Sequence, residues 1–340
     1  MKKSDTYLAI PMGDPAGIGP EILLKSLVGA SGASHVVVVG SSPLFAKSAR
    51  DLRLPGAFDA VVSTLASLHT AQQEGKRRIL YNIGGVDLAQ FAYAKVSAMC
   101  GRAAYESIKM CVSLVKEGYC GAIVTPPLHK EALQAANIPH IGHTEILAHL
   151  SGSQEAVTMF DTLGMKIFFH TRHLSLSDAC KAVTKESLLK TILQCDAIIS
   201  SNSVFDKTRP MAVAGLNPHC GEHGLFGDEE ALAIEPAIAE ARARGINVVG
   251  PIGADSVFHQ TKEGMYSSVI SLYHDQGHIA AKTLDFHQTI SITWGLPFLR
   301  TSVDHGTAFD IAGKGMADNR GMARAIQVAS EYLASEEGLS

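Results

Sequence analysis

Short apolar runs alternate with segments of helical periodicity along the chain. Several runs are apolar without alternation, such as the four valines at 36–39, which is typical of strands buried on both faces of a largely parallel sheet. The predicted strands cover residues 7–11, 35–40, 78–83, 121–125, 166–171, 211–216, 247–250, 267–273 and 289–293.

Helices are predicted between these strands. In residues 101–119, Tyr105, Ile108 and Val112 recur at helical spacing. Residues 228–244 have an acidic first turn, a basic last turn and a glycine directly after them, which predicts a second helix. The alternation of strands and helices predicts an α/β fold.

The length of the chain indicates two lobes. A chain of 340 residues is at the upper limit of what one hydrophobic core supports. We therefore expect one α/β lobe from residues 1–135 plus 300–340 and a second from residues 136–299, although no long linker marks either boundary.

Composition narrows the class of protein. The hydrophobic fraction of 46% and charged fraction of 18% describe a well-buried globule. A net charge of −4 does not predict binding to nucleic acid or to an anionic membrane. Asp14 and Pro15 interrupt the first residues of the sequence before the apolar region of a signal peptide could form. No run of 18 apolar residues occurs, so no transmembrane helix is predicted. We therefore expect a cytoplasmic protein. The six cysteines form no CxxC pair and are expected to be free thiols.

Three histidines follow strand-like runs closely. His173, His219 and His274 are each placed at or near the carboxyl end of a strand, where open α/β sheets build ligand sites. A single loop histidine is more often an ordinary polar residue than a ligand. Three neutral imidazoles with a coordination position left open are, however, what a catalytic divalent ion needs. We expect one such ion, with zinc favoured and manganese, cobalt, nickel or magnesium as alternatives.

The segment MGDPAGIGPEI at 12–22 runs from a strand through a turn into a helix. Pro20 and Glu21 suit the first turn of that helix. Gly17 and Gly19 would let the backbone approach a ligand closely. From these residues alone, a binding role and a simple tight turn are about equally supported.

A second distinctive segment, TSVDHGTAFDIAGKGMAD, lies near the carboxyl end of the chain at 301–318. Together with the amino-terminal segment, it resembles the isocitrate and isopropylmalate dehydrogenase superfamily. The resemblance implies an NAD site formed partly by His305, Gly306, Thr307, Ala308 and Asp310. The chemistry of Asp310 supports this site independently of the resemblance. Its carboxylate would accept a hydrogen bond from the ribose 2′-hydroxyl of NAD and would repel the 2′-phosphate of NADP.

Over almost its whole length the chain resembles the 4-hydroxythreonine-4-phosphate dehydrogenase family, through blocks such as IGHTEILA, AGLNPHCGE, YHDQGH and GLPFLRTSVDHGTA. The resemblance implies a two-lobed αβα architecture with the active site in the cleft between the lobes. It implies the three histidines as metal ligands and a homodimer whose active sites are shared by both subunits. It also implies substrate contacts from His143, Thr144, Lys282 and Arg300.

One position departs from the family. Where the family has Asn before GLPF, this chain has Ser291. We therefore expect the protein to contact the group at C2 of the substrate differently. This favours 4-phospho-D-threonate or 4-phospho-D-erythronate over 4-phosphooxy-L-threonine.

The expected reaction is oxidation of the 3-hydroxyl of a 4-phosphorylated four-carbon acid by NAD, followed by decarboxylation. Lys282 and Arg300 would hold anionic groups, the arginine by a bidentate fork. Asp255 and Lys282 are both candidates for the catalytic proton-relay role, and the sequence does not choose between them. Asp275 could orient the neighbouring imidazole.

Three alternatives stay open. A cis-dihydrodiol dicarboxylate dehydrogenase of the same family would keep the metal and NAD but not the phosphate contacts. A metal-dependent hydrolase or aldolase would use the same histidines but would not need the segment at 301–318. A phosphate acyltransferase-like protein could share the sheet architecture without a metal.

Overall fold

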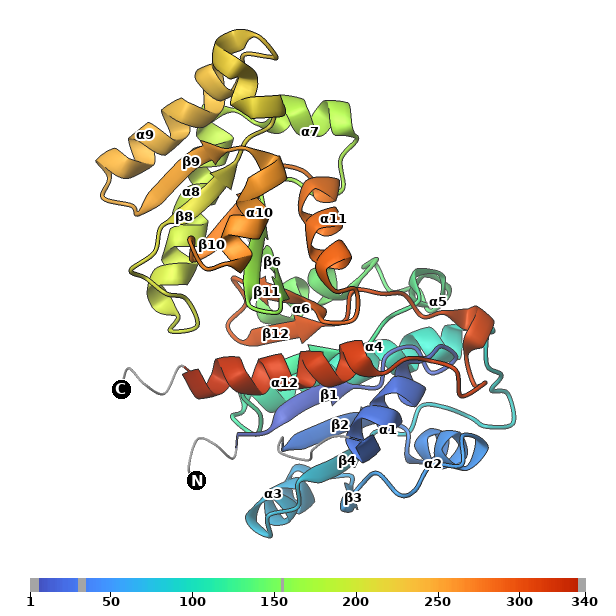
Figure 1. Cartoon of the computed structure of the whole chain (residues 1–340). Coiled ribbons are helices and arrows are strands. Elements are labelled where there is room, and N and C mark those ends of the chain that lie inside the picture. Colours follow the sequence, from blue (N-terminus) through green and yellow to red (C-terminus); the bar gives the residue numbers. More distant parts are fainter. Residues whose placement is uncertain (1–5, 30–34, 154–155, 336–340) are drawn as a thin grey trace. The chain divides into compact units, whose positions relative to one another are not determined.

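The computed structural model describes residues 6–29, 35–153 and 156–335. The described residues divide into two compact units: those up to 156 and those from 295 to 335 form unit 1, and residues 157–294 form unit 2. Figure 1 shows the helices and strands of both units. The boundaries predicted from the sequence lie at 135/136 and 299/300, whereas the units change over at 156/157 and 294/295.

Unit 1 contains a parallel sheet in the order β3-β4-β2-β1-β5-β12. Its strands are β1 (Leu8–Pro11), β2 (Val36–Gly40), β3 (Ala60–Val62), β4 (Arg78–Asn82), β5 (Ala122–Thr125) and β12 (Leu299–Ser302). Its helices are α1 (Gly19–Gly29), α2 (Ser42–Asp51), α3 (Leu65–Gln73), α4 (Ala98–Lys116), α5 (Lys130–Ala135), α6 (His143–Ser151), η4 (Phe309–Ile311) and α12 (Arg320–Ser335).

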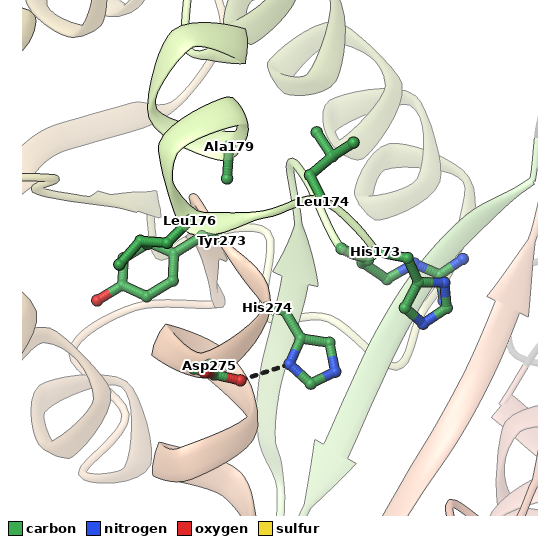
Figure 2. Close-up of a pocket in the computed structure, with 8 residues that line it drawn as sticks. His173, Leu174, Leu176, Ala179, Tyr273, His274 and Asp275 are labelled. Atoms are coloured by element: carbon green, nitrogen blue, oxygen red, sulfur yellow. Dashed lines mark hydrogen bonds and ion pairs between the residues drawn. The ribbon is translucent and has the colours of Figure 1, made fainter.

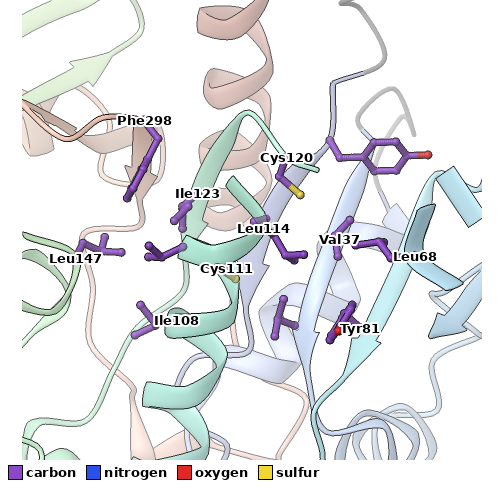
Figure 3. Packing of buried hydrophobic residues seen from close by; sticks show 14 of the residues in the cluster. Val37, Leu68, Tyr81, Ile108, Cys111, Leu114, Cys120, Ile123, Leu147 and Phe298 are labelled. Atoms are coloured by element: carbon purple, nitrogen blue, oxygen red, sulfur yellow. The ribbon is translucent and has the colours of Figure 1, made fainter. Parts of the chain in front are cut away.

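Both faces of the unit 1 sheet are buried, as the unbroken apolar runs predict. Val37 and Ile123 point into a cluster that also contains Ile108 of α4 (Figure 3). Neighbouring residues such as Val38 point to the opposite face and are equally buried. On that face α12 packs on β5 and β12, and the Thr301 hydroxyl donates to the Ala325 carbonyl at 2.9 Å.

Unit 2 contains a mixed sheet in the order β11-β6-β7-β10-β8-β9. The β11/β6 and β6/β7 pairs are antiparallel, and β7, β10, β8 and β9 are parallel neighbours. The strands are β6 (Val157–Thr162), β7 (Met165–Phe169), β8 (Met211–Ala214), β9 (Val248–Ile252), β10 (Ser268–Ser271) and β11 (Thr289–Trp294). The helical segments are α7 (Leu176–Ala182), α8 (Lys185–Ser201), η2 (Pro218–Gly224), η3 (Glu230–Ile234), α9 (Glu235–Ala243), α10 (Ala254–Lys262) and α11 (His274–Leu284).

The core of unit 2 lies where α10 and α11 cover the sheet. Phe160 and Phe169 pack there with Val257 of α10 and Ala281 of α11. The helix predicted over 228–244 is divided into the π-helical η3 and the α-helix α9. Pro236 explains the change, because its missing N–H removes one i→i−4 bond at the junction.

The nine predicted strands are all present, and the fold is α/β with a mostly parallel, mixed sheet, as predicted. Three further strands among the described residues were not predicted. β3 has only three residues, while β6 and β12 are buried yet rich in polar residues. In β6, for example, the buried Asp161 is paired with Lys166 of β7 at 3.9 Å. Among the described helices, none is long and apolar enough to cross a membrane.

Candidate functional site

Four neighbouring parallel strands of unit 2 lead into predicted site residues. His173 follows β7, His274 follows β10, His219 follows β8 and Asp255 follows β9. Because these strands are parallel and adjacent, their carboxyl ends meet at one edge of the sheet. The three histidines and Asp255 therefore belong to one edge, although they are spread over about 100 residues of sequence.

Two of the histidines share a pocket of about 270 Å³ (Figure 2). The ring centroids of His173 and His274 are 6.0 Å apart. Two imidazoles on one tetrahedral zinc would hold their centroids about 5 Å apart, given metal–nitrogen bonds of about 2.0–2.1 Å. The pair is therefore about 1 Å wider than a bound ion requires. Nitrogen donors of this kind fit a divalent transition metal.

Asp275 fixes the orientation of the His274 ring. Its Oδ1 is 2.7 Å from Nδ1 of His274, an ion pair if the ring is protonated and otherwise a hydrogen bond donated by Nδ1–H (Figure 2). That bond leaves Nε2 of the neutral ring as the lone-pair nitrogen, so the predicted orienting contact is present. This is the tautomer that a metal ligand needs.

His278 is a neighbour of the site that sequence reasoning missed. Its ring stacks on His274 with centroids 3.6 Å apart and an interplanar angle of 13°. The His278 ring also contacts the rings of Phe160 and Phe169, with centroids 4.5 and 4.8 Å away. Nδ1 of His278 donates to the His274 carbonyl at 2.8 Å. The signal was the spacing of four residues in HDQGH, which places both rings on one face of a helix.

His219 does not line the pocket of His173 and His274. It lies in the turn Pro218–Gly224, where His219, Cys220, Glu222 and His223 all have positive φ. Within the described ranges, no group of three or more His, Cys, Asp or Glu side chains is arranged to hold a metal ion. Two of the predicted ligands thus share one pocket, and the three-histidine site stays a prediction.

Glu230 holds the start of the His219 turn, and sequence reasoning missed this residue too. Its carboxylate is 2% exposed and accepts from the backbone N–H groups of Leu216 and Asn217 at 2.8 and 2.7 Å. It also accepts from Nδ2 of Asn217 at 2.8 Å. Left-handed backbone costs a non-glycine residue roughly 1–2 kcal/mol, so this turn needs such support.

Gln276 joins two of the strand ends. Its side-chain oxygen accepts from Leu272 N–H at 2.7 Å, and its amide donates to the Gly215 carbonyl at 2.8 Å. The segments that lead to His274 and His219 are therefore tied together by one buried side chain. His170, which directly follows β7, contacts Thr191 and Ser187 of α8.

Unit 1 contains a buried cationic group with a histidine beside it. Arg300 of β12 is 6% exposed and donates from Nε and Nη2 to the Thr125 hydroxyl at 3.1 and 2.9 Å. His143 is the first residue of α6, and its Nε2 is buried without a hydrogen-bond partner. Burial, reinforced by the Arg300 charge, holds the pKa of His143 well below its ordinary value. Burial therefore favours the neutral form of the His143 imidazole.

The amino terminus of α6 completes this group. Gly142 precedes the helix and offers no side-chain cap, so the first amides, including that of Thr144, have no capping partner from Gly142. A cation, a neutral imidazole and a helix amino terminus together make an environment for an anion. Lys282 and Ser291 belong to unit 2. Lys282 lies on α11 with Nζ 5.4 Å from the Phe286 ring, and Ser291 is a buried residue of β11.

The two segments on which the superfamily resemblance rests, residues 12–22 and 301–318, contact each other in unit 1. Ile18 N–H donates to the Thr307 carbonyl at 3.0 Å, and a Cβ on Gly17 would lie 2.9 Å from Thr307 atoms. Gly17 is therefore needed for close packing. Asp14 N–H also donates to the Pro127 carbonyl at 3.1 Å, which ties in the loop after β5.

The loop predicted to bind NAD has accessible backbone and an exposed carboxylate. A Cβ on Gly306 would meet open space, and Ala308 has a left-handed φ of 42°. Asp310 is exposed in the first turn of η4, and Nδ1 of His305 contacts the Gly306 carbonyl at 3.0 Å. Accessible backbone can approach the phosphates of a dinucleotide, and an exposed carboxylate can accept a hydrogen bond from its ribose.

Comparison with known proteins gives relatives over nearly the whole chain. The chain is 49% identical over 329 residues to a Fusobacterium nucleatum protein provisionally named D-threonate 4-phosphate dehydrogenase, covering 96% of this chain and 97% of the relative. A solved Klebsiella pneumoniae 4-hydroxythreonine-4-phosphate dehydrogenase matches with a TM-score of 0.86 and 38% identity, covering 97% of this chain and 98% of its own.

A more distant structure shows the fold alone. A terephthalate 1,2-cis-dihydrodiol dehydrogenase from Burkholderia xenovorans is 24% identical, with a TM-score of 0.61 and coverage of 96% and 97%. The relatives at higher identity are dehydrogenases, so this α/β protein is an oxidoreductase. The sequence pattern of the pyridoxal phosphate biosynthetic protein PdxA matches residues 32–329, and the chain belongs to that family.

Proposed function

We propose that the protein uses NAD to oxidise the 3-hydroxyl of a 4-phosphorylated four-carbon hydroxy acid, with loss of carbon dioxide. The observation that carries this proposal is the buried Arg300 beside the neutral His143 and the amino terminus of α6. A phosphate would neutralise the charge of this buried guanidinium through a bidentate contact. Thr144 would add a backbone donor.

The hydroxyl end of the substrate is assigned to the strand ends of unit 2. We propose His173, His274 and His219 as ligands of one divalent ion, supported by the shared pocket and by the Asp275 contact. When bound, such an ion would lower the pKa of the substrate hydroxyl. The left-handed turn at His219, held by Glu230, is the kind of strained backbone that concentrates at functional sites.

Asp255 is the better candidate for the base that takes the hydroxyl proton. Burial is the main cause of the raised pKa of the Cys220 thiol, and the charges of Glu230, Asp255 and Glu235 add to it, so Asp255 lies near the residue that follows His219. Lys282 lies eight residues after His274 on α11, about 12 Å along the helix axis. We assign Lys282 to an anionic group of the substrate and Asp255 to the proton relay.

The reaction balances with NAD as oxidant. The hydride leaves C3 for the nicotinamide, and the hydroxyl proton goes to the base. The C1–C2 bond of the resulting β-keto acid then breaks, carbon dioxide departs, and C2 takes a proton. The segment His305, Gly306, Thr307, Ala308 and Asp310 is proposed to hold the cofactor, with Asp310 on the adenosine ribose.

The preferred substrate is 4-phospho-D-threonate or 4-phospho-D-erythronate, with dihydroxyacetone phosphate as the product. Ser291, in place of the family's asparagine, and the names of the 49% identical relatives support this choice. 4-Phosphooxy-L-threonine would instead give 3-amino-2-oxopropyl phosphate. We further propose a cytoplasmic homodimer with shared active sites, on the family resemblance alone.

A substrate panel tests the proposal. NADH formation is measured with the three phosphorylated acids, their unphosphorylated forms and a cis-dihydrodiol diacid, before and after exhaustive chelation. We expect turnover of a phosphorylated acid only, abolished by chelation and restored by zinc, manganese or cobalt. Comparable rates without the phosphate would refute the anion site, and preference for the dihydrodiol would favour the rival dehydrogenase. Full activity after chelation would refute the metal.

A further inference from the structure

Helix α1 contacts the loop that follows the predicted cofactor segment. The Lys25 ammonium donates to the carbonyls of Gly315 and Ala317 at 2.9 and 2.8 Å. It also donates to Oε1 of Glu21 at 2.8 Å. That same oxygen accepts from the Ala317 N–H at 2.8 Å. An ammonium group has three donors, and all three are used here.

This contact fixes a segment that has little regular structure of its own. Residues 312–319 lie between η4 and α12, and Gly313 and Gly315 both have left-handed φ, at 73° and 72°. Glu21 is 3% exposed, so its contacts are shielded from water. The backbone polar groups at 315 and 317 thus depend on two side chains of α1.

We propose that Glu21 and Lys25 are positioning residues for the dinucleotide. The amino-terminal turn holds the cofactor segment at Thr307 through Ile18, and Glu21 and Lys25 hold the continuation of the same loop. A loop that is ordered before binding loses less conformational entropy when NAD arrives, so affinity is higher. The inference rests on the proposed assignment of NAD to residues 305–310.

The test is Lys25→Met, which keeps the aliphatic stem and removes the three donors. We expect the dissociation constant for NAD, measured by calorimetry, to rise about 10-fold. Hydrogen exchange of the amides at 312–318 should become faster, while KM for the hydroxy acid at saturating NAD stays within a few-fold. Lys116→Met is the matched control, because Lys116 also donates to a distant carbonyl, that of Leu150 at 2.8 Å.

A second variant guards against misfolding. Glu21→Gln keeps an oxygen that can accept from Lys25 and Ala317 but removes the charge, so it should shift both measurements in the same direction by less. Faster exchange in Lys25→Met with wild-type NAD affinity would overturn the positioning role. Unchanged exchange would show that the contact does not order the loop. A wild-type protein that binds no NAD would instead refute the proposed function, and this inference with it.

Discussion

Asp275→Asn tests whether the contact between Asp275 and His274 serves a bound metal. Asparagine keeps an oxygen that can accept from Nδ1–H at the observed 2.7 Å but removes the negative charge. Carboxylates that orient a ligating histidine typically contribute 10- to 100-fold to metal affinity. The Asp275 side chain is 71% exposed, so solvent screens its charge, and we expect the lower end of that range. The expected loss is about 10-fold, or about 1.4 kcal/mol.

The assay is competition for zinc or cobalt with a chromophoric chelator at low ionic strength. Asp275→Ala removes the acceptor as well and should lose more affinity than Asp275→Asn. Asp178→Asn is the control, because Asp178 is also an exposed carboxylate of unit 2 but binds Ser175 and Lys181. NAD affinity should stay unchanged in all three variants. Wild-type metal affinity in both Asp275 variants would refute the orienting role.

Three further predictions concern single residues. His219→Ala should abolish turnover while NAD affinity stays within a few-fold, and full activity in steady-state assays would contradict its role as a ligand. The wild-type protein should prefer NAD over NADP by at least about 10-fold, and Asp310→Asn should narrow that ratio; equal use of both cofactors by the wild type would contradict the assignment. Burial raises the pKa of Asp14, against the opposing effects of the Ala16 N–H bond and His129. When folding raises the pKa of a carboxyl group, the folded protein is destabilised as the pH rises and that group ionises. Asp14→Asn should therefore raise the free energy of unfolding, measured in urea, at pH 8 but not near pH 4. An equal effect at both pH values would show that ionisation is not the cause.

The sequence predicted the fold class and the strand ends well because both depend on local pattern. Buried parallel strands have continuous apolar runs, and His173 and His274 lie four and three positions past the ends of such strands. The strands that escaped, such as β12, bury polar residues whose partners are distant in sequence. Arg300, for example, donates to the Thr125 hydroxyl, 175 residues away.

The supporting residues could not be predicted for the same reason. Nothing in the sequence near Glu230 indicates that its carboxylate binds the backbone before His219, because the contact depends on where η3 packs. Nor does a single sequence indicate that Glu21 meets Ala317 across 296 positions. By contrast, the pairing of His274 with Asp275 lies within adjacent residues and was predicted.

The division of unit 1 between the two ends of the chain has a consequence for synthesis. The ribosome makes β1 and β5 early, but β12, which pairs with β5, is made only after all of unit 2. Until then β5 has one edge that β12 has yet to cover, and unpaired strand edges promote aggregation. Premature termination shortly before residue 299 would leave unit 2 intact while removing Arg300, the cofactor segment and the partner of β5 together. We therefore expect such truncated chains to be recovered mainly as aggregates or degradation products.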